Sequence, residues 1–152
     1  MSKLVVLDIN GVIACNKNGL RITENGKHVV NELSKRYTIG LFSSTTKRNV
    51  DKFVAESGVA DKFRFVYSRE KTRHDELLGG YATVKHLQTV FAEHPEFNYF
   101  NTIIVDDTPE KVRYNPEQNT LIAKPNMDLV AEINHKFYTL DRFWLARMAR
   151  RR

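Results

Sequence analysis

LVVLDINGVI, residues Leu4–Ile13, predicts a buried β-strand that ends in a carboxylate and a glycine-permitted turn. A second apolar run, residues 102–105, ends in the same way with Asp106 and Asp107. Open α/β sheets hold their ligands at the carboxyl ends of strands, so we expect these two strand ends to bring three carboxylates together. Aspartate also commonly caps a turn after a strand. For either strand end taken alone, turn capping explains the aspartate as well as a ligand site does.

Three carboxylates at one place repel one another unless a proton or a cation is present. Hard divalent cations such as Mg²⁺ prefer oxygen ligands. The sequence therefore favours a Mg²⁺ site formed by Asp8, Asp106 and Asp107 over a cluster that is relieved only by a raised pKa.

Strand and helix patterns alternate along the chain. Strands are predicted at residues 3–8, 37–42, 63–67, 102–106 and 121–123, and helices at 29–36, 47–56 and 83–91. This alternation predicts an α/β fold, a Rossmann-like three-layer sandwich whose central sheet is mostly parallel and covered on both faces. Two polar stretches, residues 15–27 and 68–81, are predicted to be loops at the rim of the site.

Length and composition predict one domain. A chain of 152 residues that is 41% hydrophobic can bury a full core but is too short for two ordinary domains. We expect the domain at residues 1–140 and a basic C-terminal helix or tail at 141–152. No apolar run approaches membrane-spanning length, the start of the chain lacks a signal-peptide pattern, and Cys15 is the single cysteine. These features predict an intracellular protein, cytoplasmic or nuclear, that is neither secreted nor membrane-bound.

The formal net charge of +6 favours an anionic partner, which can be nucleic acid, a phosphopeptide or an acidic protein. Five arginines fall within residues 142–152, interleaved with Phe143, Trp144 and Met148. One interpretation is a last helix that packs these three apolar side chains on the body and leaves its arginines in solvent. The other is a tail that binds nucleic acid or directs nuclear import.

Two further polar residues lie at the ends of predicted elements. Ser43 follows the strand at 37–42, and Lys85 lies near the start of the helix predicted at 83–91. Taken alone, Ser43 is typical of a turn and Lys85 of a solvated helix. Together with Asp8 and a metal-binding acidic pair, they supply what phosphoryl transfer through an aspartyl-phosphate requires: a nucleophilic carboxylate, a hydroxyl donor and an ammonium group.

The order of these residues resembles the four motifs of the haloacid dehalogenase superfamily: Asp8-Ile9-Asn10-Gly11, Ser43, Lys85 and Asp106-Asp107. More narrowly, the chain resembles the carboxy-terminal-domain phosphatases of RNA polymerase II and the NLI-interacting-factor-like proteins. That resemblance covers roughly residues 3–125 and is carried by residues 42–51, Arg69-Glu70, residues 105–111 and Asn115-Pro116.

The resemblance implies a role for each motif residue. Asp8 would be the nucleophile and a Mg²⁺ ligand, and the backbone carbonyl of Asn10 a second ligand. Asp106 and Asp107 would complete the metal shell, directly or through water. The remaining positions would contact the substrate: Ser43 and Lys85 would hold the phosphate, Arg69 would face the substrate, and Ser44 would be a further substrate-binding residue.

Asn10 departs from the family pattern, which usually has aspartate two residues after the nucleophile. That aspartate protonates the leaving oxygen and then activates water, and losing such a general acid/base typically costs ~10²–10⁴ in rate. Three interpretations remain open: Asn10 is native to a branch with Asn-Gly here, it is an engineered change, or the protein is a pseudoenzyme that binds phosphorylated ligands.

The short spacings between Asp8, Ser43, Lys85 and Asp106 leave no room for a large cap domain, so the cleft should be open. An open cleft suits a phosphate presented on a macromolecule. The sequence therefore predicts a Mg²⁺-dependent phosphatase acting on phosphoserine or phosphothreonine in a protein, with its general acid weakened by Asn10. The alternatives are a catalytically weak protein that binds phosphorylated protein or nucleic acid, and a nucleic-acid terminal phosphatase.

Overall fold

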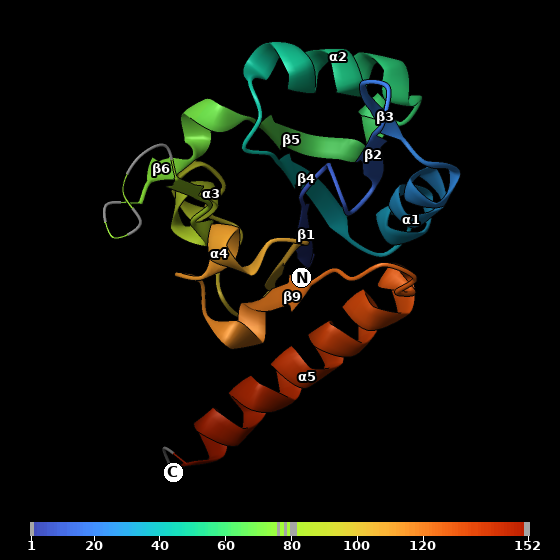
Figure 1. The fold of residues 1–152 in the computed structure, drawn as a ribbon. Helices are drawn as coiled ribbons and strands as arrows, with labels where there is room; N and C mark the ends of the chain where they lie inside the picture. The colour runs from blue at the N-terminus through green and yellow to red at the C-terminus, as the bar shows by residue number, and fades with distance from the viewer. Residues whose placement is uncertain (1, 76, 78, 80–81, 151–152) are drawn as a thin grey trace.

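A five-stranded sheet forms the centre of the computed structural model, which describes residues 2–75, 77, 79 and 82–150 (Figure 1). The strand order is β5 (Phe63–Tyr67), β4 (Thr38–Phe42), β1 (Leu4–Leu7), β8 (Thr102–Asp106) and β9 (Thr120–Ile122). Every neighbouring pair is parallel. All residues of β1 and β8 are buried, as expected for central strands covered on both faces. The predicted α/β class with a parallel central sheet is confirmed.

Helices cover both faces of this sheet. On one face, α1 (Glu24–Ser34), α2 (Lys47–Ser57) and α5 (Leu129–Arg150) share a core with Val5 and Leu7 of β1. On the other face, α3 (Leu87–Glu93) and α4 (Pro109–Val112) pack with Leu4 and Val6. Successive residues of β1 therefore point to opposite cores, which gives the three-layer arrangement.

The segment between β1 and α1 is more ordered than predicted. The stretch 15–27, expected to be a loop, contains the antiparallel hairpin of β2 (Ala14–Asn16) and β3 (Leu20–Ile22) and the start of α1. Helix α1 begins five residues earlier than residue 29, because the Thr23 side chain caps it by accepting a hydrogen bond from Gly26 N at 2.8 Å.

The prediction of a helix from residue 83 is wrong. Residues Thr83–Val84 form β7, which pairs antiparallel with β6 (Arg73–His74), and α3 begins only at Leu87. Lys85 therefore lies in an extended connection rather than in a helix. The stretch 68–81, expected to be a loop, contains η2 (Arg69–Lys71) and β6; its glycine pair includes Gly80, which lies outside the described residues. The remaining 3₁₀ turns are η1 (Ala60–Lys62) and η3 (Glu117–Asn119).

Helix α5 runs without a break across the boundary expected at residue 140, and its C-terminal end projects from the body (Figure 1). Four of its residues are buried: Leu129, Ile133, Phe137 and Leu140. Trp144 also packs on the body, with its ring 4.4 Å from that of Phe100, whereas Met148 is 54% exposed. The expected packing of Met148 is therefore wrong, because the helix has already left the core at that point. None of the described helices is long and apolar enough to span a membrane.

The register of the sheet places the predicted site residues at one edge. Leu7 of β1 is opposite Leu41 of β4 and Val105 of β8, so these three strands end at the same level of the sheet. Asp8 N donates a hydrogen bond to Val105 O at 2.9 Å, which puts Asp8 directly beside Asp106. Within the described residues, no separate cap domain interrupts the connections that surround this edge.

Candidate active site

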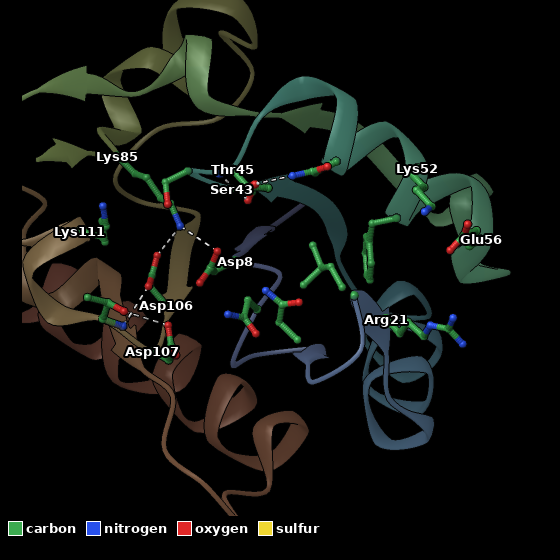
Figure 2. Close-up of a pocket in the computed structure, with 18 of the residues that line it drawn as sticks. Asp8, Arg21, Ser43, Thr45, Lys52, Glu56, Lys85, Asp106, Asp107 and Lys111 are labelled. Atoms are coloured by element: carbon green, nitrogen blue, oxygen red, sulfur yellow. Dashed lines mark hydrogen bonds and ion pairs between the residues drawn. The ribbon is translucent and has the colours of Figure 1, made fainter. Parts of the chain in front are cut away.

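A polar cleft with a volume of about 450 Å³ opens at the carboxyl edge of the sheet (Figure 2). It brings together most of the predicted site residues, from three strand ends and the connection before α3. They are Asp8, Asn10, Ser43, Ser44, Lys85, Asp106 and Asp107. The parallel register is the reason that residues so distant in sequence share one cleft.

Lys85 is the centre of the charge network. Its ammonium nitrogen donates to Asp8 Oδ1 at 2.9 Å and to Asp106 Oδ2 at 2.5 Å, and the residue is only 1% exposed. A buried charge is tolerated when it is paired and hydrogen-bonded in this way. One ammonium shared by two buried carboxylates still leaves the group with a net negative charge.

The environment of Asp8 raises the pKa of its carboxyl group. Burial raises the pKa of Asp8 from 3.8 to about 7; Lys85 opposes the rise, and the neighbouring Asp106 adds to it. A further positive charge at this position would favour the ionised carboxylate. The site is therefore electrostatically suited to a cation.

Asn115 fixes the backbone on both sides of Lys85. Its Nδ2 donates to Lys85 O at 2.8 Å, and its Oδ1 accepts from Leu87 N at 2.8 Å. Lys85 N also donates to Lys111 O at 2.7 Å. The sequence indicates Asn115 only through the family resemblance of the Asn115-Pro116 pair. Its structural role depends on contacts with residues 28 to 30 positions away, which no local sequence pattern predicts.

Asp107 and the turn after Asp8 approach each other closely. Gly11 has φ of +82°, and a Cβ at this position would lie 2.0 Å from Asp107 Oδ2. The positive φ favours glycine here, and any larger residue would also displace the Asp107 carboxylate. One carboxylate oxygen from each of Asp8, Asp106 and Asp107 lies within 4.8 Å of the others.

These residues fit Mg²⁺, which prefers oxygen ligands and often uses few carboxylates. Asp106 is already engaged through both oxygens, Oδ2 with Lys85 and Oδ1 with Thr108 N at 2.9 Å. Asp107 is exposed and accepts only at Oδ1, from Thr108 Oγ1 at 3.0 Å, among the described residues. Asp107 therefore has the more accessible carboxylate for a cation, and Asp106 orients Lys85.

Ser43 lies across the cleft from the carboxylates. It is buried, its backbone nitrogen donates to Tyr67 O, and its Oγ accepts from Thr45 N at 3.1 Å. Within the described part of the chain its hydroxyl donates no hydrogen bond, so the proton remains available to an anionic ligand. This geometry suits a phosphate oxygen.

Arg69 is not among the residues that line the cleft. Its side chain is exposed, and Nε donates to Ser44 O at 3.1 Å while its backbone nitrogen donates to Thr45 O at 2.8 Å. Arg69 therefore supports the loop that carries Ser43 and Ser44.

A model of the NLI interacting factor-like phosphatase family matches residues 3–140. The chain belongs to this family. No curated protein sequence matches the chain significantly.

Solved structures share the fold of this NLI interacting factor-like chain at low sequence identity. A variant of the fission yeast RNA polymerase II CTD phosphatase Fcp1, bound to beryllium fluoride, matches with a TM-score of 0.61 and 12% identity over 93% of this chain and 51% of that one. The chain thus spans about half the length of that Fcp1 structure.

Two bacterial structures give similar agreement. A predicted HAD-like family hydrolase from Porphyromonas gingivalis matches with a TM-score of 0.57 and 12% identity, over 89% of this chain and 97% of that one. The N-terminal part of a Bacteroides fragilis protein, containing a phosphatase domain complexed with Mg, matches with a TM-score of 0.59 and 13% identity, over 93% and 40%. At these identities the likeness establishes the fold.

The cleft of this NLI interacting factor-like chain is lined by more residues than the sequence predicts. Asn10 is exposed and lies in the cleft, as expected. Arg21 of β3 and Asn49 and Lys52 of α2 line it too, and sequence analysis did not predict them. No local signal distinguished these residues from ordinary solvated positions, because only the packing of the β2–β3 hairpin against α2 places them there.

Proposed function

We propose that this chain is a Mg²⁺-dependent phosphatase that forms an aspartyl-phosphate on Asp8. The observation that carries the proposal is the position of Asp8, at the end of β1 with its carboxylate held by Lys85 inside the cleft. Membership of a phosphatase family supports the same reaction class.

In the first step, a carboxylate oxygen of Asp8 attacks phosphorus and the bond from phosphorus to the substrate oxygen breaks. Lys85 and the Ser43 hydroxyl are placed to neutralise the phosphate oxygens. Mg²⁺ held by Asp8, Asp107 and the Asn10 carbonyl, with Asp106 supporting, would stabilise the charge of the transferring group. Water then attacks the phosphorus, which releases phosphate and restores the Asp8 carboxylate.

Asn10 limits this reaction at its proton transfers. The leaving alkoxide of phosphoserine needs a proton, and the attacking water must lose one. The side-chain amide of Asn10 can act neither as the general acid nor as the general base for these transfers. An aryl oxide leaves without such help because it is a weaker base. The proposed enzyme therefore hydrolyses aryl phosphates more readily than phosphoserine.

The open cleft supports a macromolecular substrate. The connections around the site are the β2–β3 hairpin, α1 and the short segments η2, β6 and β7. None of these described segments encloses a small molecule, so affinity must come from contacts beside the phosphate. Phosphoserine or phosphothreonine in an intracellular protein is the proposed substrate.

The test is turnover of an aryl phosphate with and without Mg²⁺. Wild-type protein should show Mg²⁺-dependent turnover, and Asp8→Asn should abolish it because the nucleophile is gone. Asp61→Asn, an exposed aspartate outside the cleft, is the matched control and should leave turnover unchanged. Equal rates for Asp8→Asn and wild type would contradict the proposal.

A phosphate-binding protein without turnover is the second candidate, and Asn10 is the observation that favours it. This candidate predicts that phosphopeptides bind in the cleft while aryl phosphate is not hydrolysed, even when Asn10 is changed to aspartate.

A further inference from the structure

The cleft continues beyond the carboxylates along β3 and α2 (Figure 2). In this view Arg21, Lys52 and Glu56 lie well away from Asp8 and Lys85, at the far end of the same cavity. An adjoining cavity of about 360 Å³ shares Arg21 and Glu56 with the first and extends it further. We call this extension the flank groove; it is formed by Leu20, Arg21, Ile22, Lys27, Asn49, Lys52, Phe53 and Glu56.

The flank groove carries three cations, Arg21, Lys27 and Lys52. Arg21 and Lys52 make no ion pair or hydrogen bond through their side chains with any other residue in the described ranges. Lys47 of the same helix, in contrast, is paired with Asp51 at 2.6 Å. Glu56 is the one acidic residue of the groove, so the three cations leave it with a net positive charge available to an anionic ligand.

The remaining walls suit an extended polypeptide. Asn49, together with Asn16 and Asn18 of the neighbouring hairpin, offers both donors and acceptors for a peptide backbone. Single-stranded nucleic acid needs exposed aromatic rings on which its bases can stack. The aromatic residue described in this groove, Phe53, is 2% exposed and buried in the core, so the groove provides no stacking surface.

We infer that the flank groove binds an acidic segment beside the phosphorylated residue. The substrate class is then a phosphoserine or phosphothreonine polypeptide whose neighbouring residues are acidic or themselves phosphorylated. This inference rests on the proposed function, because it requires the phosphate to sit at Asp8, Ser43 and Lys85. Arg21 and Lys52 determine which substrates bind, and they take no part in the bond-breaking step.

The test compares two peptides that carry a non-hydrolysable phosphonate analogue of phosphoserine. One peptide has glutamates at the second to fourth positions from the analogue, and the other has glutamines there. Each peptide is made in two versions, with these residues on the N-terminal or on the C-terminal side of the analogue. Binding is measured by fluorescence anisotropy in Mg²⁺. The wild-type protein should bind the glutamate peptide about tenfold more tightly in one of the two versions, which corresponds to two exposed ion pairs of ordinary strength.

The variant Arg21→Gln/Lys52→Gln should lose most of this preference. Both positions are exposed, and glutamine is well tolerated in a helix such as α2, which contains Lys52, so the variant should fold. Lys35→Gln/Lys62→Gln is the matched control, because it changes net charge equally near the amino ends of β4 and β5, at the opposite edge of the sheet. The control should keep the preference of the wild type.

Three results would overturn the inference. The first is equal binding of the glutamate and glutamine peptides by the wild type. The second is a glutamate preference that survives Arg21→Gln/Lys52→Gln. The third is binding of a short single-stranded oligonucleotide that depends on Arg21 and Lys52 while peptide binding does not. Aryl phosphate turnover by the wild type is measured in parallel. Turnover without a glutamate preference refutes the groove alone, whereas a glutamate preference without turnover refutes the phosphatase proposal alone.

Discussion

Replacing Asp8 with asparagine should stabilise the metal-free protein at alkaline pH while it removes the nucleophile. Asp8 is 9% exposed, and burial raises the pKa of its carboxyl group from 3.8 to about 7. Lys85 does not compensate fully, because Asp106 shares its ammonium group. The ionised carboxylate is therefore an unfavourable group in the folded protein until a cation binds.

The sign and size of the effect follow from proton linkage. The pKa of the folded state lies above that of the unfolded state, so the stability contribution of this group is fully present below pH 3.8 and is lost as the pH rises through about 7. The full loss amounts to ~4 kcal/mol. Asparagine resembles the protonated acid, so Asp8→Asn should avoid this loss, and its stabilisation should be ~2–3 kcal/mol larger at pH 8.5 than at pH 5.

Urea unfolding in the presence of a chelator measures this difference. The control is Asp107→Asn, because Asp107 is the exposed carboxylate of the same site; its effect on the free energy of unfolding should be small. An Asp8→Asn protein that is less stable than the wild type at pH 8.5, or that differs from it equally at both pH values, would refute the electrostatic account of Asp8.

Three further predictions concern the metal, the support of Lys85 and the C-terminal helix. Calorimetry should detect Mg²⁺ binding to the wild type and a large loss of affinity in Asp106→Ala/Asp107→Ala; equal affinities would remove the metal assignment. Asn115→Ala should cost ~2–4 kcal/mol in urea unfolding, because buried hydrogen bonds to Lys85 O and Leu87 N are lost; a cost below ~1 kcal/mol would show that these bonds are not needed. Deleting residues 147–152 should leave the free energy of unfolding within ~0.5 kcal/mol of the wild type, since Arg147 and Met148 are exposed. If that segment binds nucleic acid, the deletion should also reduce the salt dependence of binding, whereas an unchanged dependence would mean a solvated helix.

The strands and their ends could be predicted because their signals are local. The apolar runs that became β1, β4 and β8 each end in a polar residue, and a parallel sheet must bring such ends to one edge. Asp8, Ser43 and Asp106 were placed together on this ground alone, and the structure places them in one cleft.

The parts that sequence analysis missed depend on contacts between distant segments. Val84, Leu87 and Val90 have helical spacing, yet Val84 lies in β7 because it pairs with Arg73 of β6. The spacing of buried residues alone does not distinguish these outcomes.

The same limit applies to the cleft lining. Arg21 has the sequence context of an ordinary exposed arginine, and Lys52 that of a solvated helix residue. Their place in the cleft depends on how the β2–β3 hairpin packs on α2, which no local pattern encodes.

Hydrolysis of phosphoserine peptide and of aryl phosphate by Asn10→Asp tests the central claim most directly. If Asp8 is a nucleophile in a site that lacks only its general acid/base, the substitution should accelerate phosphoserine hydrolysis by ~10² or more and aryl phosphate hydrolysis far less, because only the alkoxide needs a proton to leave. If both rates stay at background while Mg²⁺ still binds, more than the acid is missing, and the phosphatase account is wrong.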